Sequence, residues 1–410
     1  MRRFGGLLVV LVLASVLPAS AAAGVAGSEA AGFLDGPIFR VNGGGGSVHQ
    51  NLPTVAVNTS TGDYLVTWVD DRSGQSAVYA RVLDSAGTPA GPDHLVGLGY
   101  SPAASRYNPV SDTYLAVWEQ NDVIMARALN PDGTRAGPAR AVAEGARPAA
   151  AVNTTTGEVL VVFRVSGPGD SSSTIRSRRV LPNGFPFGPV KVVADSATFH
   201  DIPAITYNPV DDVYAVAFRS YIEPDGASIR ARRLLGSNGR RTGAERVVAQ
   251  DFWLNDVDIT VNPDRSEYLV VFGDDRDLGA MGSAREFTPR HVGVTRLDDR
   301  LRTRSEAQAD VVAAETASNP PAVAYSGNSM EYVVVWGEVP WTDDNISNFL
   351  IRRVNKFGTP RGEPRDIDGG AEKWGWQIDV VCNPVSGGCL AAWTDNRRGT
   401  TNVFARLLTG

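Results

Sequence analysis

The sequence predicts an all-β fold, a seven-bladed β-propeller of four-stranded antiparallel blades whose ring is closed by the N-terminal strand in the last blade. Three observations support this prediction. An apolar phrase with a central aromatic residue recurs seven times, and each copy is surrounded by three further strand-like runs. The mature chain shows no helical period. A segment near the N-terminus matches the run that the last repeat lacks.

The repeated phrase is clearest at residues 64–72, YLVTWVDDR, and at residues 268–276, YLVVFGDDR. Its aromatic residue aligns seven copies, spaced 45 to 64 residues apart, at Trp68, Trp118, Phe163, Phe218, Phe272, Trp336 and Trp393. A continuous run of Val, Leu and aromatic residues is typical of a strand that is buried on both faces. We therefore expect the phrase to be the second strand of each blade and part of the scaffold.

The other three strands surround this phrase. Before it lies a short apolar run, such as PTVAVN at 53–58, followed by a turn rich in Asn, Pro, Gly and Asp. After it come a run ending in Arg and an aliphatic residue, such as VYARVL at 78–83, and a fourth run, such as DHLVG at 93–97. One such sheet can bury both faces only between neighbours in a ring, which favours a propeller.

Ring closure is predicted from the two ends of the chain. The seventh repeat ends at Gly410, just after its third strand. Residues 36–42, GPIFRVN, match the fourth-strand runs at 91–97 and 137–143. We expect this N-terminal segment to complete the last blade, which would leave no open sheet edge.

The first residues read as a secretory signal peptide, with Arg2 and Arg3 before a short apolar run and two A-x-A cleavage sites. The run is shorter than the roughly 20 residues that span a bilayer, although an uncleaved anchor is the alternative. The expected domains are a signal peptide at 1–23, an N-terminal segment at 24–35 and the propeller at 36–410. We expect a secreted, extracellular monomer with no membrane partner.

The charge balance is mildly acidic, with 39 Lys and Arg against 45 Asp and Glu, which argues against nucleic acid as a partner. Cys382 and Cys389 are separated by a turn and should form a disulfide bond across a hairpin in an oxidising compartment. Two cysteines are too few for a zinc site, and the four histidines show no metal-ligand spacing. No metal and no cofactor are predicted.

An Arg closes the third strand of every repeat, at Arg81, Arg127, Arg179, Arg233, Arg296, Arg353 and Arg406. We interpret these residues as structural, through an ion pair or a carbonyl contact between strands; a ring that grips an acidic ligand is the alternative. The Asp-Asp-Arg tips at 70–72 and 274–276 are candidate acidic partners. Their oxygen ligands are too few and too scattered to predict a calcium site.

Function is expected where the repeat is broken. The loops between second and third strands and between blades share one face, and these loops vary in length and composition. The partner-binding candidates are the large apolar residues in and near them: Tyr100, Trp253, Met281, Phe287, Trp341, Phe349, Trp374 and Trp376. Exposed clusters of this kind suggest a protein or carbohydrate partner, and the alternative is that the rings fill the space between blades.

Motifs for catalysis are missing from the sequence, and no catalytic residue is predicted. There is no G-x-S-x-G elbow and no phosphate-cradling loop. A glycosidase needs two carboxylates at a defined separation, which the variable loops could supply.

The YLVVW-type repeats, the signal peptide and the closing strand resemble a group of secreted actinobacterial propellers that includes the dispase autolysis-inducing protein of streptomycetes. The resemblance covers essentially the whole mature chain. It implies a non-enzymatic protein that binds a neutral metalloprotease and promotes its autolysis, and that is also a substrate of a transglutaminase. A lectin-like carbohydrate-binding module and a polysaccharide-active glycosidase or lyase remain the alternatives.

Overall fold

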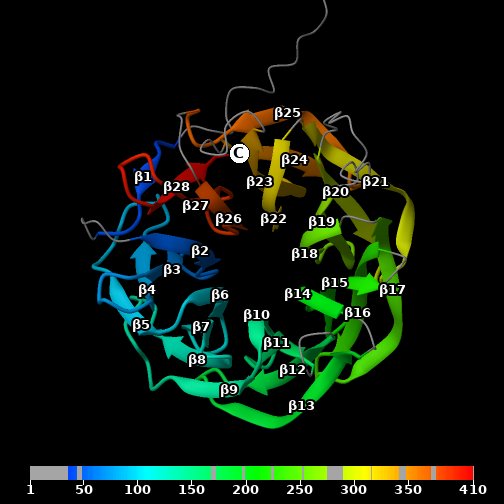
Figure 1. Cartoon of the computed structure of the whole chain (residues 1–410), viewed down its shortest axis with the longest axis horizontal. Helices are drawn as coiled ribbons and strands as arrows, with labels where there is room; N and C mark the ends of the chain where they lie inside the picture. Colours follow the sequence, from blue (N-terminus) through cyan, green and yellow to red (C-terminus); the bar gives the residue numbers. More distant parts are fainter. Residues whose placement is uncertain are drawn as a thin grey trace, which may run out of the picture.

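The computed structural model describes residues 36–43, 49–167, 172–195, 199–222, 226–251, 254–274, 290–314, 316–340, 348–370 and 375–409. The described residues form strands and no helix, so this part of the chain has no helix that could cross a membrane. The strands make seven four-stranded antiparallel sheets that surround a central axis (Figure 1). The predicted fold class is confirmed.

The blades follow the order of the chain. Blades one and two contain β2 (Gln50–Val57), β3 (Tyr64–Asp70), β4 (Ala77–Leu83), β5 (His94–Leu98), β6 (Ser101–Asn108), β7 (Thr113–Gln120), β8 (Val123–Leu129) and β9 (Arg140–Glu144). Blades three and four contain β10 (Ala146–Val152), β11 (Val159–Ser166), β12 (Ser173–Val180), β13 (Pro186–Ala194), β14 (Phe199–Asn208), β15 (Val213–Ile222), β16 (Gly226–Leu235) and β17 (Arg241–Asp251).

The last three blades complete the ring. Blades five and six contain β18 (Leu254–Asn262), β19 (Glu267–Asp274), β20 (Arg290–Leu297), β21 (Thr303–Ala314), β22 (Thr316–Ser326), β23 (Glu331–Pro340), β24 (Asn348–Asn355) and β25 (Pro360–Asp366). Blade seven contains β26 (Gly375–Cys382), β27 (Cys389–Asp395), β28 (Asn402–Leu408) and, as its fourth strand, β1 (Phe39–Arg40).

The N-terminal segment closes blade seven as predicted. Phe39 lies opposite Ala405 and Arg40 opposite Phe404 in the β1–β28 pair. The contact continues beyond β1, where the backbone N–H of Val41 donates to the carbonyl of Val403 at 2.8 Å. The proposed leader and the segment at 24–35 lie outside the described residues, so they stay predictions.

The second strands form the core, as the repeated phrase predicts. Every residue of β3 is buried. The aligned aromatic side chains of all seven second strands are at most 1% exposed. Burying a side chain of this size stabilises the fold by about 1.5–3 kcal/mol, so seven of them are a large share of the packing energy.

The first Asp of the Asp-Asp-Arg tip accepts a hydrogen bond from the buried tryptophan before it. The indole N–H of Trp68 donates to Oδ2 of Asp70 at 3.0 Å, and Arg72 binds the same carboxylate through its Nε at 2.8 Å. Blade seven repeats this arrangement, with Trp393 Nε1 donating to Asp395 at 2.8 Å. These two tips are therefore part of the scaffold, and each aspartate binds the Arg of its own tip. Residues 275 and 276 of the other predicted tip lie outside the described residues.

The third-strand arginines contact the preceding blade, and the structure corrects their alignment. In blade one, Arg81 lies opposite Val66, two residues before the aromatic residue. The residues in the same register in the other blades are Arg127, Arg178, Arg232, Thr295, Arg352 and Arg406. The alignment on Arg179, Arg233, Arg296 and Arg353 was wrong by one residue. Neighbouring residues in a strand point to opposite faces, so these four arginines lie on the other face of their sheets.

The correctly aligned arginines confirm the interpretation as carbonyl contacts. The Nη1 atom of Arg81 donates to the carbonyl of Val41 at 2.8 Å, and that of Arg178 donates to the carbonyl of Val142 at 2.5 Å. Both carbonyls lie in or next to the fourth strand of the preceding blade. Arg127 and Arg406 make the same kind of contact, to the carbonyls of Val96 and Ile367. Blades four and five differ, because Arg232 pairs with Glu245 of its own blade and blade five has Thr295 at this position.

The Asn that ends a first strand joins blades near the axis. Asn383 Oδ1 accepts the backbone N–H of Val385 at 2.9 Å, which closes its own turn. Its Nδ2 donates to the carbonyl of Gly62 at 2.8 Å and to the hydroxyl of Tyr64 at 3.1 Å, both in blade one. The Asn and Tyr of the repeat therefore form hydrogen bonds that join neighbouring blades.

Candidate binding site in the central channel

The first strands of the blades line the central axis (Figure 1). Between them lies a cavity of about 310 Å³. Its lining residues come from the last positions of each first strand, such as Val55, Ala56 and Val57 immediately before Asn58. We call the face formed by the turns between first and second and between third and fourth strands the turn face, and the opposite face the loop face. The cavity lies in the half of the channel next to the turn face.

Two positions in these first strands show where the repeat is broken. Both are counted back from the residue that starts the turn after the first strand, which is Asn58, Asn108, Asn153, Asn208, Asn262, Ser326 or Asn383. Two residues before it, the blades in order carry Ala56, Arg106, Ala151, Thr206, Thr260, Ala324 and Val381. Four residues before it, they carry Thr54, Ala104, Ala149, Ala204, Asp258, Ala322 and Asp379. Most are small, but Arg106, Asp258 and Asp379 are charged, and all three line the cavity.

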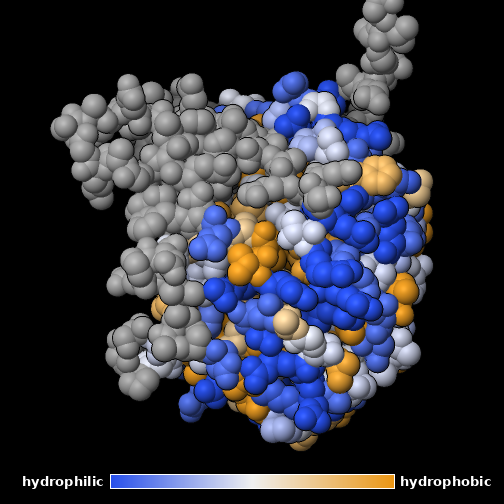
Figure 2. Space-filling model, turned by 90° about the vertical axis from the view of Figure 1, so that its right-hand side faces the viewer, coloured by the Kyte–Doolittle hydropathy of each residue, from blue (hydrophilic) through white to orange (hydrophobic). Residues whose placement is uncertain are grey.

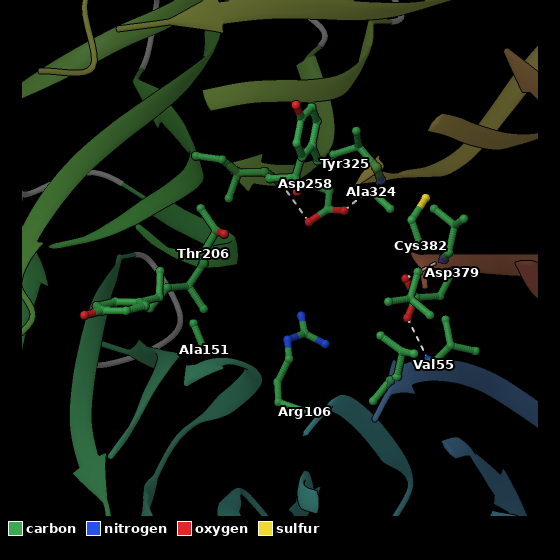
Figure 3. A pocket seen from close by; sticks show the side chains of 18 of the residues that line it. Val55, Arg106, Ala151, Thr206, Asp258, Ala324, Tyr325, Asp379 and Cys382 are labelled. Atoms are coloured by element: carbon green, nitrogen blue, oxygen red, sulfur yellow. Dashed lines mark hydrogen bonds between the residues drawn. The ribbon is translucent and has the colours of Figure 1, made fainter. Parts of the chain in front are cut away.

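The two aspartates are held in the same way. Asp258 Oδ2 accepts the backbone N–H of Val323 in the next blade at 2.9 Å, and its Oδ1 accepts the N–H of Ile259 at 2.8 Å. Asp379 accepts the N–H of Val55 in blade one at 2.9 Å and that of Val380 at 2.8 Å. Each carboxylate is thus fixed in orientation at the wall of the channel (Figure 3).

The enclosed position of these carboxylates changes their acidity. Burial in the channel raises the pKa of Asp258 to about 6, and the negative charge of Asp379 acts in the same direction. Burial also raises the pKa of Asp379 above its ordinary value, which the positive charge of Arg106 opposes. The three groups therefore share one electrostatic environment although they belong to three blades.

Arg106 extends from β6 into the cavity, on the side away from Asp258 (Figure 3). Its Nη1 donates to the carbonyl of Ser105 at 2.9 Å. That bond uses one of the five N–H donors of the guanidinium.

The cavity has the features of a small-ligand site. Its volume lies at the lower end of the roughly 300–1,000 Å³ that is usual for ligand pockets. About half of its lining residues are aliphatic, and three of the described lining residues are charged. Within the described part of the chain, no three His, Cys, Asp or Glu side chains gather as a metal site.

Most of the partner-binding candidates lie outside the described residues: Trp253, Met281, Phe287, Trp341 and Trp374. Trp376 belongs to β26, and its side chain is outside the described part. Their role stays a prediction.

Phe349 and Tyr100 are described. Phe349 is 0% exposed, with its ring centroid 6.1 Å from that of Trp393, so it packs in the core and is not part of an exposed cluster. Gly337 faces it across the β23–β24 pair, inside a regular ladder rather than in a loop. Tyr100 is 45% exposed, and its hydroxyl donates to Glu119. That hydrogen bond is the largest cause that raises the pKa of Tyr100 to about 12.

The predicted disulfide is present. Cys382 and Cys389 lie directly opposite each other in the β26–β27 hairpin and form a bond with an S–S distance of 2.07 Å. Cys382 also lines the cavity.

The comparisons with known proteins show the fold alone. No protein-family model matches the chain, and no curated protein does. Among solved structures, it is similar to the hydrazine synthase of Kuenenia stuttgartiensis, with a TM-score of 0.58 and 11% identity over 85% of this chain and 94% of that one. It is also similar to the β-propeller domain of Cps50 (Swd1) from Myceliophteria thermophila, with a TM-score of 0.52 and 12% identity over 91% and 99% of the two chains. A third similar structure is the WD40 domain of Toxoplasma gondii coronin, with a TM-score of 0.52 and 9% identity over 92% of this chain and 89% of that one.

Proposed function

We propose that this chain is a secreted, non-catalytic propeller that binds another extracellular protein, and that its partner is a neutral metalloprotease whose autolysis it promotes. The fold supports the general part, because propellers present broad faces that often bind proteins. The sequence resemblance supports the specific partner, and it also suggests a transglutaminase that modifies the chain.

The observation that carries the proposal is a group of exposed apolar side chains on the turn face. Val110, Val210, Met330 and Val385 lie in turns between first and second strands and are 49% to 63% exposed. Phe185 and Phe357 lie in turns between third and fourth strands and are 46% exposed. These six are most of the large apolar side chains that are exposed in the described residues. Apolar residues that gather on one face of a protein favour a docking role for that face.

The outer rim has a different character. Seen from the side that carries β17, hydrophilic residues cover most of the described surface, and hydrophobic residues lie in small patches between them (Figure 2). The contrast favours docking on a face of the disc rather than on its edge.

The test is to mix the purified mature chain with a thermolysin-like neutral metalloprotease and follow the residual protease activity and the intact protease band. We expect the protease to disappear faster in the presence of the chain, while the chain alone hydrolyses no protein or polysaccharide. An unchanged protease lifetime at molar excess would contradict the metalloprotease partner.

Surface variants separate the two faces. Val210→Asp/Val385→Asp is expected to weaken protease binding at least tenfold without changing the melting temperature, because both side chains are exposed. Val247→Asp, on the outer strand β17, is the matched control and should bind like the wild type. If Trp341→Ala/Phe287→Ala abolishes binding and the turn-face variant does not, docking is on the loop face instead.

A further inference from the structure

We propose that the central channel is a second, separate binding site, for a small zwitterion that carries a protonated amine and a carboxylate a few bonds apart, such as a free α-amino acid. The site does not depend on the proposed protein partner. It rests on the charges of the cavity, on the absence of charges at the same positions in most other blades, and on the volume that they surround.

The charges are arranged for a ligand with two opposite ends. Arg106 extends into the cavity from one side, while the carboxylates of Asp258 and Asp379 lie on other sides of it (Figure 3). A guanidinium is the preferred partner of a carboxylate, and two carboxylates can share the donors of an ammonium group. A zwitterion therefore offers each of the three residues a group of opposite charge.

A ligand with a single charge fits less well. A simple cation between the two aspartates would be repelled by Arg106, and a simple anion at Arg106 would be repelled by the aspartates. In an enclosed site such repulsion is screened much less than at a surface.

Most blades have no charged residue at these two positions. The residues equivalent to Asp258 in blades two, three, four and six are Ala104, Ala149, Ala204 and Ala322. Arg106 is replaced by Ala56, Ala151 and Ala324 in blades one, three and six. Blades that carry only a methyl group at these positions pack into the same ring. Placing a charge in an enclosed channel has a desolvation cost, which a ligand of opposite charge offsets.

The volume sets an upper limit on the ligand. A cavity of about 310 Å³ holds on the order of ten water-sized groups at about 30 Å³ each. That is enough for a compact amino acid and too little for a folded segment of another protein.

Isothermal titration calorimetry on the full mature chain tests the proposal with three small amino acids, L-alanine, glycine and L-serine, and with methylamine, sodium acetate and calcium chloride as probes of a single charge. We expect L-alanine to bind and the methylamine and acetate halves to bind at least tenfold more weakly. Binding of methylamine as tight as that of L-alanine, or binding of calcium alone, would overturn the zwitterion assignment. No heat with L-alanine, glycine or L-serine at about 10 mM would overturn it as well.

Variants assign the two ends of the ligand. Arg106→Ala should weaken L-alanine binding at least tenfold and leave methylamine binding unchanged or stronger. Asp379→Asn and Asp258→Asn should weaken both L-alanine and methylamine binding. Arg241→Ala, on the outer strand β17 and outside the cavity, is the matched control and should bind like the wild type. Melting temperatures verify that each variant is folded, and wild-type affinity in a folded Arg106→Ala variant would contradict the proposal.

Discussion

At the scale of single residues, the Asp two positions after a buried tryptophan explains why the repeated phrase ends in acidic residues. An indole N–H that is buried without an acceptor costs free energy, and Asp70 and Asp395 each supply that acceptor. The pairing is not strict: blade five carries Asp274 two residues after Phe272, which has no N–H, and in blade two the indole N–H of Trp118 donates to the carbonyl of Leu98 at 2.7 Å instead.

This explanation gives a test. Asp70→Ala is expected to lower the free energy of unfolding by about 2–3 kcal/mol, because it leaves the indole N–H of Trp68 buried without a partner. Urea unfolding followed by fluorescence measures the change. The double variant Trp68→Phe/Asp70→Ala is the control and should lose less than the sum of the two single variants. Equal unfolding midpoints for Asp70→Ala and the wild type would show that the hydrogen bond from Trp68 to Asp70 does not stabilise the fold.

The same residue predicts a dependence on pH. Burial alone would raise the pKa of Asp70, but hydrogen bonds from Arg72 and Trp68 outweigh it and hold that pKa below its ordinary value. The contribution of Asp70 is therefore complete above the pKa of the unfolded chain, about 3.9, and is lost as the pH falls through the lower folded value. The stability difference between wild type and Asp70→Ala should accordingly shrink below about pH 4.

At the scale of elements, the first strand of each blade combines two tasks. Its last residue, usually Asn, closes a turn and contacts the next blade, and the residues before it line the channel. Because the scaffold fixes the end of the strand in every blade, single residues two and four positions earlier can change without altering the ring. That division explains how Arg106 and Asp258 occur in a repeat that is otherwise uniform.

Substitution of Asn383 separates its two contacts. Asn383→Ala is expected to lower the free energy of unfolding by about 2–4 kcal/mol, because it removes both the turn acceptor and the donor to blade one. Asn383→Asp keeps the acceptor and should lose about half as much. Differential scanning calorimetry compares them, and identical losses in the two variants would mean that the turn contact carries no weight.

The strands were predictable because each strand of the blade recurs in seven repeats. A pattern of apolar residues that is weak in one blade is therefore supported by the same pattern in the others. The register of the third-strand arginines was not, since RR at 178–179, 232–233 and 352–353 offers two candidates and only pairing with the second strand distinguishes them. The charged residues of the channel could have been found from the sequence. An alignment of the first strands on the residue that starts the following turn shows them at positions that carry small or aliphatic residues in most other blades. The binding candidates predicted from the sequence all lie in or near the longer, variable loops, so they do not include Arg106, Asp258 and Asp379.

At the scale of the whole molecule, β1 joins the two ends of the chain. Val41 is fully buried, and the side chain of Asn42 donates to Asn402 at 3.2 Å and to Gln50 at 3.3 Å. Asn42 Oδ1 also accepts the backbone N–H of Val403 at 3.0 Å. Closure therefore depends on a few buried residues that follow a strand of only two residues.

Deletion of residues 36–42 tests the closure. A chain that starts at residue 43 is expected to lose on the order of 2–4 kcal/mol of stability and to self-associate, because it loses the buried Val41 and exposes β28 as an open edge. Calorimetry and light scattering measure the two effects. A chain that starts at residue 36 is the control and should match the mature protein. A shortened chain that stays monomeric with an unchanged melting temperature would contradict the role of β1.

The placement of β1 also has a consequence for the order of events during synthesis. Residues 39 and 40 are among the first of the propeller to be translated, and their partners Ala405 and Phe404 are among the last. Six blades can form while the chain is still being made, but the first segment has no partner until the end has been delivered. The ring can therefore close only after β28 has been made.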